Sequence, residues 1–144
     1  MVLQELLVNI TIILIVVPIS GAMGLVSHEI LHWITGYMSR GDPSFTNWRL
    51  KMPGAVDFGS PHSMSNRQVR LVGGVVFIFP VFLILFALLT TPSDIRNNPV
   101  LMGGLAFLFG GSVISETDII AVRSPEAWKK LASGEAIDLG DLGY

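Results

Sequence analysis

Three long stretches of the chain contain no ionisable side chain. They are the 22 residues between Glu5 and His28, the 23 between Arg70 and Asp94, and the 19 between Arg96 and Glu116. A helix that crosses a bilayer needs about 20 predominantly apolar residues. Only 14% of the 144 residues are charged, whereas a typical soluble domain has about 25%. The pattern therefore predicts an all-α integral membrane protein with about three transmembrane helices, and it excludes a soluble globular or a disordered chain.

The first predicted span runs from about Leu6 to Met38, which is long for a single crossing. It either tilts as one helix or breaks around Pro18–Gly21, where proline removes a backbone donor and glycine loosens the chain. Because no basic residue precedes Arg40, we expect a retained helix rather than a cleaved signal peptide. The second span is predicted from about Val69 to Leu89 with a kink at Pro80, and the third from about Val100 to Val122.

The segments outside the spans carry weaker signals. In the long connection, two short strands are predicted at Phe45–Leu50 and Ala55–Phe58, with a turn at Pro53–Gly54. In the tail, Ser124 as a helix cap, Pro125 at the first position and Gly134 as a stop predict a short C-terminal helix.

An apolar face on this tail helix predicts that it lies on the membrane interface. The face is formed by Ala127, Trp128 and Leu131. We also expect Trp33, Trp48 and Trp128 to be interface anchors, and we treat residues 1–144 as a single membrane-embedded domain.

The sequence His28-Glu29-Ile30-Leu31-His32 is the most specific motif in the chain. On a helix, positions i and i+4 project from the same face, so the two imidazoles can bind one Zn²⁺. Glu29 lies beside them as a candidate base, because zinc lowers the pKa of its water ligand to about 7. Three ionisable side chains within five positions of an apolar span are costly unless they have a function. The chain has no cysteine, which excludes a thiolate metal site.

A third protein ligand must come from another part of the chain, and the candidates are Asp118 and Glu116. On a continuous helix, Asp118 shares its face with Gly104, Gly111 and Ser115, whereas Glu116 lies on a bulkier face. Small residues allow membrane helices to approach closely. The first span has a matching small-residue stripe on its histidine face, which includes Gly21, Gly24 and Gly36. We therefore expect Asp118 to be the third ligand, with Glu116 in a supporting or boundary position.

The arrangement of these motifs resembles the site-2 protease family of intramembrane zinc metalloproteases, and more closely its compact zincin-type relatives. In them an HExxH motif closes the first hydrophobic segment, and a Ser-x-x-Asp-like motif lies in the last, as Ser115-Glu116-Thr117-Asp118 does here. The larger members have glycine after that aspartate, where this chain has Ile119. The resemblance implies that His28, His32 and Asp118 bind zinc and that Glu29 is the catalytic base.

The predicted function is a zinc metalloendopeptidase that hydrolyses a membrane-embedded or membrane-adjacent peptide, with the lipid bilayer as its surroundings. An alternative is a non-catalytic metal-binding or chaperone-like membrane protein that retains the site, and a third is a purely structural helical membrane protein. His62 is expected to be a loop histidine, with oxyanion stabilisation as its alternative role. The net charge of −2 gives no sign of the excess of basic residues that is typical of nucleic-acid binding.

The distribution of basic residues predicts the orientation of the chain in the membrane. The connection from Arg40 to Arg70 and the tail together hold eight of the nine Lys and Arg residues, so both are expected to be cytoplasmic. The short connection at 94–96 is then external.

Single cysteines test this topology, because the natural chain has none. Cysteines introduced at Ser44 and Ser133 should resist an impermeant thiol reagent in intact cells, whereas one at Asn97 should react. The opposite labelling pattern would reverse the predicted orientation.

Overall fold

A computed structural model of the chain describes Leu7, residues 10–47, residues 54–138 and Gly140. The chain divides into two compact units. Unit 1 combines Met1–Ser27 with Ile78–Val113, and unit 2 combines His28–Phe77 with Ile114–Tyr144. Among the described residues, two helices are long and apolar enough to cross a membrane: Ile12–Met38 and Asn66–Leu89. These two helices are compatible with a membrane protein, while the number of three crossings stays a prediction.

The first span is a continuous helix with no break at Pro18–Gly21. Its irregular part is a π-helical turn at Ile12–Val16 (η1), which leads directly into α2 (Val17–Met38). The proline ring at Pro18 collides with the carbonyl four residues earlier in a regular α-helix. That carbonyl belongs to Leu14, inside the π-turn, so the wider turn accommodates the ring without ending the helix.

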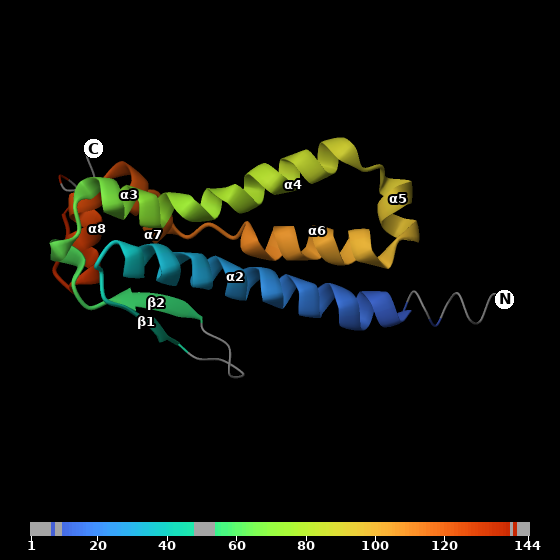
Figure 1. Ribbon diagram of the computed structural model, residues 1–144, viewed down its shortest axis with the longest axis horizontal. Helices are drawn as coiled ribbons and strands as arrows, with labels where there is room; N and C mark the ends of the chain where they lie inside the picture. Colours follow the sequence, from blue (N-terminus) through green and yellow to red (C-terminus); the bar gives the residue numbers. More distant parts are fainter. Residues whose placement is uncertain (1–6, 8–9, 48–53, 139, 141–144) are drawn as a thin grey trace. The chain divides into compact units, whose positions relative to one another are not determined.

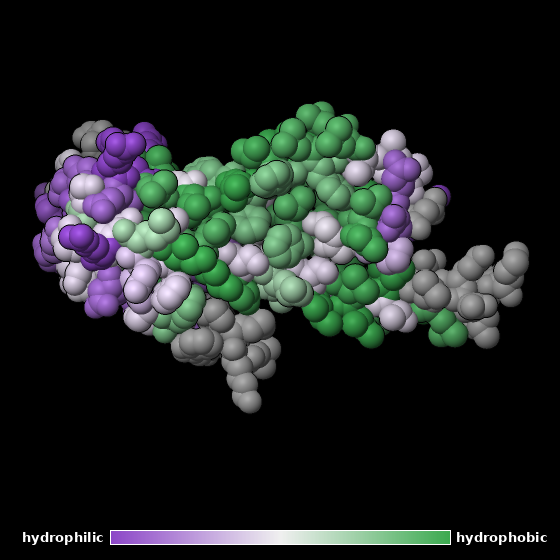
Figure 2. Space-filling model, in the orientation of Figure 1, coloured by the Kyte–Doolittle hydropathy of each residue, from purple (hydrophilic) through white to green (hydrophobic). Residues whose placement is uncertain are grey.

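Unit 1 continues with α4 (Ile78–Leu89), α5 (Pro92–Asn97) and α6 (Pro99–Gly111), which follow one another in Figure 1. Hydrophobic side chains cover α4 in Figure 2, and hydrophilic ones gather at α5. Along α4 many large apolar side chains are exposed, including Val81, Ile84 and Leu88. Such a surface suits a lipid environment rather than water.

Glycines bring α2 and α6 into close contact in unit 1. A Cβ added at Gly24 would overlap the Phe107 carbonyl and lie 2.8 Å from the Gly111 nitrogen. A Cβ at Gly110 would likewise overlap the Gly21 carbonyl. The predicted contact between two small-residue stripes is confirmed for Gly24 and Gly111, because residues without a side chain let the backbones meet. Gly110, which meets Gly21, was not part of the predicted stripe. Gly104, also assigned to the stripe, faces Phe86 of α4 instead.

The predicted third helix from Val100 to Val122 is wrong as a single element. α6 ends at Gly111, and α7 (Glu116–Arg123) begins as a separate helix. The interruption has a local cause, since Ser115 caps α7 through a reciprocal capping box with Asp118. A capping box satisfies the free N–H groups at a helix start, which favours a new helix at this point.

Unit 2 contains the histidine end of α2, a hairpin, and three short helices. The hairpin pairs β1 (Pro43–Thr46) antiparallel with β2 (Ala55–Phe58), so that Phe45 lies opposite Val56. The second strand matches its prediction, whereas the first begins two residues earlier than expected. Residues 48–53, which include the predicted turn proline and Trp48, lie outside the described residues.

A short helical turn at Pro61–Ser63 (η2) precedes α3 (Asn66–Gly74). A 3₁₀ turn at Val75–Phe77 (η3) then joins α3 to α4. A kink was predicted at Pro80. The helix is instead irregular one turn earlier, in η3, which contains Val76, the residue whose carbonyl the Pro80 ring would clash with in a regular α-helix.

The C-terminal helix α8 (Pro125–Ala132) has the predicted ends, and Gly134 follows it with a φ of +79°. One detail of the prediction is wrong, because the Ser124 side chain makes no capping hydrogen bond. Of the predicted apolar face, Ala127 and Trp128 are buried and Leu131 is exposed, and α8 contacts α3 and α7. Trp128 is therefore a core residue and not an interface anchor. It lies in the core of unit 2, which comprises Met64, Val69, Val72, Ala121 and Trp128.

Polar and aromatic contacts hold α8 and the hairpin in unit 2. The buried Lys129 ammonium donates to Asn66 of α3 at 2.8 Å and to Glu126 at 3.2 Å. The Phe58 ring lies edge-on to Trp128 and against Gly36 of α2. These contacts join the helix that carries the histidines to the rest of unit 2.

Two adjacent glycines provide a matched test of the packing between α3 and α7. A Cβ at Gly73 would lie 2.5 Å from the Ala121 Cβ and 2.8 Å from the Asp118 carbonyl, whereas a Cβ at Gly74 meets only Val122 at 3.8 Å. Gly73→Ala should therefore destabilise the protein by about 1–3 kcal/mol through overpacking. Gly74→Ala should stabilise it by about 0.5–1 kcal/mol through helix propensity. Denaturant unfolding of the two variants checks both signs, and equal effects would contradict the packing described.

Candidate metal centre

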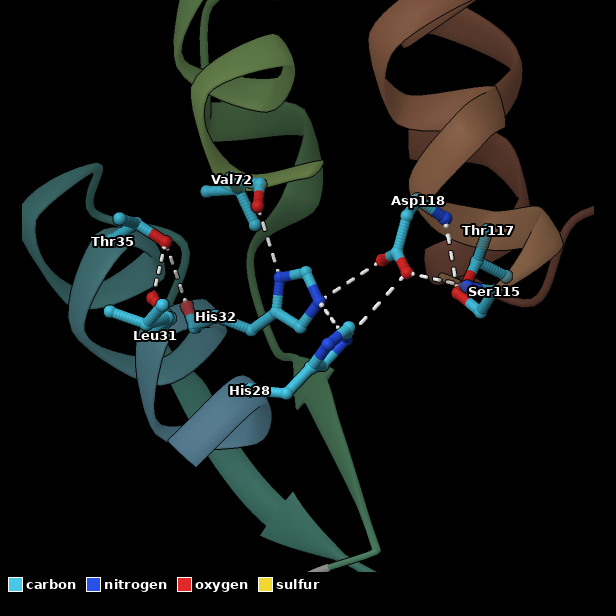
Figure 3. A network of polar contacts seen from close by, with 8 residues as sticks. All are labelled: His28, Leu31, His32, Thr35, Val72, Ser115, Thr117 and Asp118. Atoms are coloured by element: carbon cyan, nitrogen blue, oxygen red, sulfur yellow. Dashed lines mark hydrogen bonds and ion pairs between the residues drawn. The ribbon is translucent and has the colours of Figure 1, made fainter. Parts of the chain in front are cut away.

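Three buried polar side chains of unit 2 converge on one point. His28 and His32 come from successive turns of α2, and Asp118 comes from the first turn of α7 (Figure 3). Their exposed fractions are 4%, 8% and 5%, so water supplies little of their solvation. Their polar contacts must therefore come from other groups of the protein or from a bound ion.

The ligand atoms lie close together. The two Nε2 atoms are 3.1 Å apart. Asp118 places Oδ1 3.0 Å from the His32 Nε2 and Oδ2 3.7 Å from the His28 Nε2. Within the described part of the chain, this is the group of three His, Asp or Glu side chains whose positions can hold a metal ion.

The hydrogen bond on the other side of the His32 ring fixes its tautomer. His32 Nδ1 lies 3.0 Å from the backbone carbonyl of Val72 on α3, and a carbonyl can only accept. His32 therefore carries a proton on Nδ1, and in its neutral form Nε2 presents a lone pair. That lone pair faces a carboxylate oxygen at 3.0 Å, a contact that is repulsive unless a proton or a cation lies between the two atoms.

The Asp118 carboxylate is oriented by its own helix. Its Oδ2 accepts the Ser115 backbone N–H at 2.8 Å, while the Ser115 hydroxyl accepts the Asp118 N–H at 3.2 Å (Figure 3). Since Oδ2 is held by the backbone, Oδ1 is directed towards His32.

Glu29 is half-buried on α2, and it lies close enough to His28, His32 and Asp118 to interact with their charges. Glu29 is not one of the three grouped ligand candidates, and it follows His28 directly in the chain.

The structure separates the two acidic candidates for the third position. Asp118 is buried against both histidines, whereas Glu116 is exposed at the start of α7. The structure thus places Asp118 rather than Glu116 beside both histidines, although the face argument that favoured Asp118 is wrong. A helical wheel drawn from Gly104 to Asp118 crosses the interruption between α6 and α7, so those residues share no common face.

His62 does not join the cluster. Its Nε2 lies 3.0 Å from the Glu135 carboxylate and 3.2 Å from the Ser133 hydroxyl, and its side chain is 55% exposed. Hydrogen bonds from Ser133 and His62 hold the pKa of Glu135 below its usual range. The His62 side chain therefore contacts the tail, as expected of a loop histidine, and is not one of the three grouped side chains.

Two contributors to the site were not recognised from the sequence. The Val72 carbonyl leaves no signal in a residue pattern, because any residue has a carbonyl. Ser115 does leave a signal, since Ser-x-x-Asp is a helix-capping pattern. Comparisons with known proteins add no further guide: no protein family, curated protein or solved structure matches the chain.

Proposed function

We propose that this chain is an intramembrane zinc metallopeptidase that hydrolyses a peptide bond in a membrane-embedded or membrane-adjacent substrate. The observation that carries the proposal is the convergence of His28, His32 and Asp118 beside Glu29. Two imidazoles and one carboxylate are the protein ligands of many catalytic zinc sites, which keep a fourth position open.

The spacing of the ligand atoms fits a tetrahedral zinc ion. Zinc binds nitrogen and carboxylate oxygen at about 2.0–2.2 Å, which places neighbouring ligands roughly 3.3–3.5 Å apart. The His32 Nε2 lies 3.1 Å from the His28 Nε2 and 3.0 Å from the Asp118 Oδ1, and the second Asp118 oxygen, Oδ2, lies 3.7 Å from the His28 Nε2. With one ligand atom taken from each residue, all three atoms lie within 4.8 Å of one another. A cation would also remove the conflict between the His32 lone pair and the Asp118 oxygen. A protonated His32 would do the same, and metal analysis distinguishes the two cases.

The metal, when bound, supplies acidification of water and polarisation of a substrate carbonyl. In the proposed reaction, Glu29 accepts a proton from water while the water oxygen attacks the peptide carbonyl carbon. The carbon–nitrogen bond then breaks, and Glu29 returns the proton to the leaving amine. Glu29 thus acts first as a base and then as an acid, and atoms and charges balance over the cycle.

The hairpin offers a way to hold an extended substrate. Within the described residues, β1 and β2 form a two-stranded sheet, so each strand is an edge strand. An unwound peptide segment can add to such an edge as a further strand. The proposal places this connection and the C-terminal tail on the cytoplasmic side, following the basic residues.

Metal content tests the ligand assignment. The purified chain should hold about one Zn²⁺, and His28→Ala, His32→Ala and Asp118→Asn should each remove most of it, because they delete a ligand. Glu116→Gln is the matched control, since it changes a carboxylate two residues from Asp118 that is exposed, and it should retain zinc. Elemental analysis and a zinc titration measure both. A chain that binds no zinc, or that loses it only in Glu116→Gln, contradicts the assignment.

The role of Glu29 is tested by separating binding from turnover. Glu29→Gln keeps the shape of the side chain but cannot transfer a proton, so it should retain zinc and lose at least 10²-fold in peptide cleavage. Cleavage of a panel of membrane-segment peptides in detergent or vesicles provides the readout. If the unaltered chain binds zinc but cleaves nothing, the alternative of a non-catalytic metal-binding membrane protein replaces the peptidase.

A further inference from the structure

Three of the described helices begin with a capping box, in which the cap residue pairs with the third residue of the helix. The three boxes differ in the further contacts that this third residue makes. The pairs are Ser65 with Gln68, Thr91 with Asp94, and Ser115 with Asp118. In each pair the third side chain returns to the backbone N–H of the cap residue. Only the carboxylate of Asp118 also contacts other ionisable side chains within this group, through its Oδ1 to His32 and its Oδ2 to His28.

The two acidic boxes make a close comparison. In both, a carboxylate oxygen accepts the cap N–H, at 2.9 Å for Asp94 and 2.8 Å for Asp118. Asp94 is exposed at the start of α5 in unit 1, whereas Asp118 is buried in unit 2. The same local geometry thus serves helix capping alone in one case, and capping together with the histidine cluster in the other.

The cap restricts the carboxylate of Asp118. A free aspartate side chain rotates about two bonds, and a buried ligand must hold one of those rotamers. The Ser115 hydroxyl fixes the first turn of α7 by accepting the Asp118 N–H at 3.2 Å. The fixed first turn aligns the Ser115 backbone N–H with the Asp118 Oδ2. The other oxygen, Oδ1, then faces His32. A second contact, between the Ser115 and Thr117 hydroxyls at 2.7 Å, supports the same turn.

We infer that Ser115 is a positioning residue of the metal centre: by capping α7, its side chain holds the Asp118 carboxylate in the orientation that faces both histidines. The inference rests on the proposed metal site and deepens it. Groups that orient a ligand without touching the metal contribute to affinity, and their loss typically weakens binding by about 10–100-fold. Ser115 therefore acts on the metal through Asp118, and not through the proposed reaction.

The test is a competitive Zn²⁺ titration of the full chain in detergent, with the Co²⁺ absorption spectrum recorded in parallel. Ser115→Ala should bind Zn²⁺ about 10–100-fold more weakly and should shift the Co²⁺ bands, since the carboxylate is no longer fixed. Ser115→Thr retains a capping hydroxyl and should restore both the affinity and the spectrum. Thr91→Ala removes the matched cap at Asp94 and should leave both unchanged.

A second hydroxyl-free variant guards against a folding defect. Glycine is tolerated at helix caps, so Ser115→Gly should remain folded and show the same weakening of Zn²⁺ binding as Ser115→Ala. Unaltered Zn²⁺ affinity in Ser115→Ala or Ser115→Gly would overturn the inference while the metal site stands. Equal weakening in Thr91→Ala would also overturn it, because the effect would then be a general loss of stability. Failure of the unaltered chain to bind Zn²⁺ would overturn the metal site itself.

Discussion

The mutual satisfaction of three buried polar side chains is the constraint on which unit 2 depends. His28, His32 and Asp118 lie in an apolar chain. Burying a polar group there without a hydrogen-bond partner costs about 2–7 kcal/mol of folding free energy. Their contacts require α2, α3 and α7 to meet at one place, since the Val72 carbonyl and the Ser115 N–H are part of the same network. Among the described residues, every buried polar side-chain atom has a partner. Two further contacts hold these helices together: Gly73 of α3 lies against α7, and α8 packs on both α3 and α7.

The histidine pair and its acidic partner were predictable because local rules control them. The i, i+4 spacing fixes the direction of His28 and His32 on any helix, whatever the rest of the fold does. Asp118 was identified by a face argument that assumed a continuous third span. The actual reason is the capping box, which begins a new helix at Glu116 and directs the carboxylate inward. The Ser-x-x-Asp pattern was visible in the sequence, and its capping chemistry explains both the interruption and the orientation of the Asp118 carboxylate.

The parts that the sequence did not predict depend on contacts between distant segments. Trp128 has the amphipathic character of an interface anchor, and only the proximity of Met64, Val69 and Val72 makes it a core residue. Similarly, the sequence of α8 fits a membrane surface as well as a protein surface, and only its contacts with α3 and α7 explain why Ala127 is buried. His62 is a comparable case, because its partner Glu135 lies 73 residues away. No pattern within a single segment contains this information.

The π-turn at Ile12–Val16 has a consequence for how the first helix tolerates changes in length. A π-turn is equivalent to an α-helix that has gained one residue, and such turns occur mostly as single insertions. Ile10 and Thr11, which directly precede it, are therefore rotated by about 100° relative to an uninterrupted helix, while Gly21, Gly24, His28 and His32 keep their common phase. Deleting one residue from this turn would return it to regular helix and would not change the phase of the four residues that follow. Deleting one between Gly24 and His28 would rotate the histidines away from the small-residue face of the same helix. The register of this helix is therefore constrained after the π-turn, between Gly21 and His32.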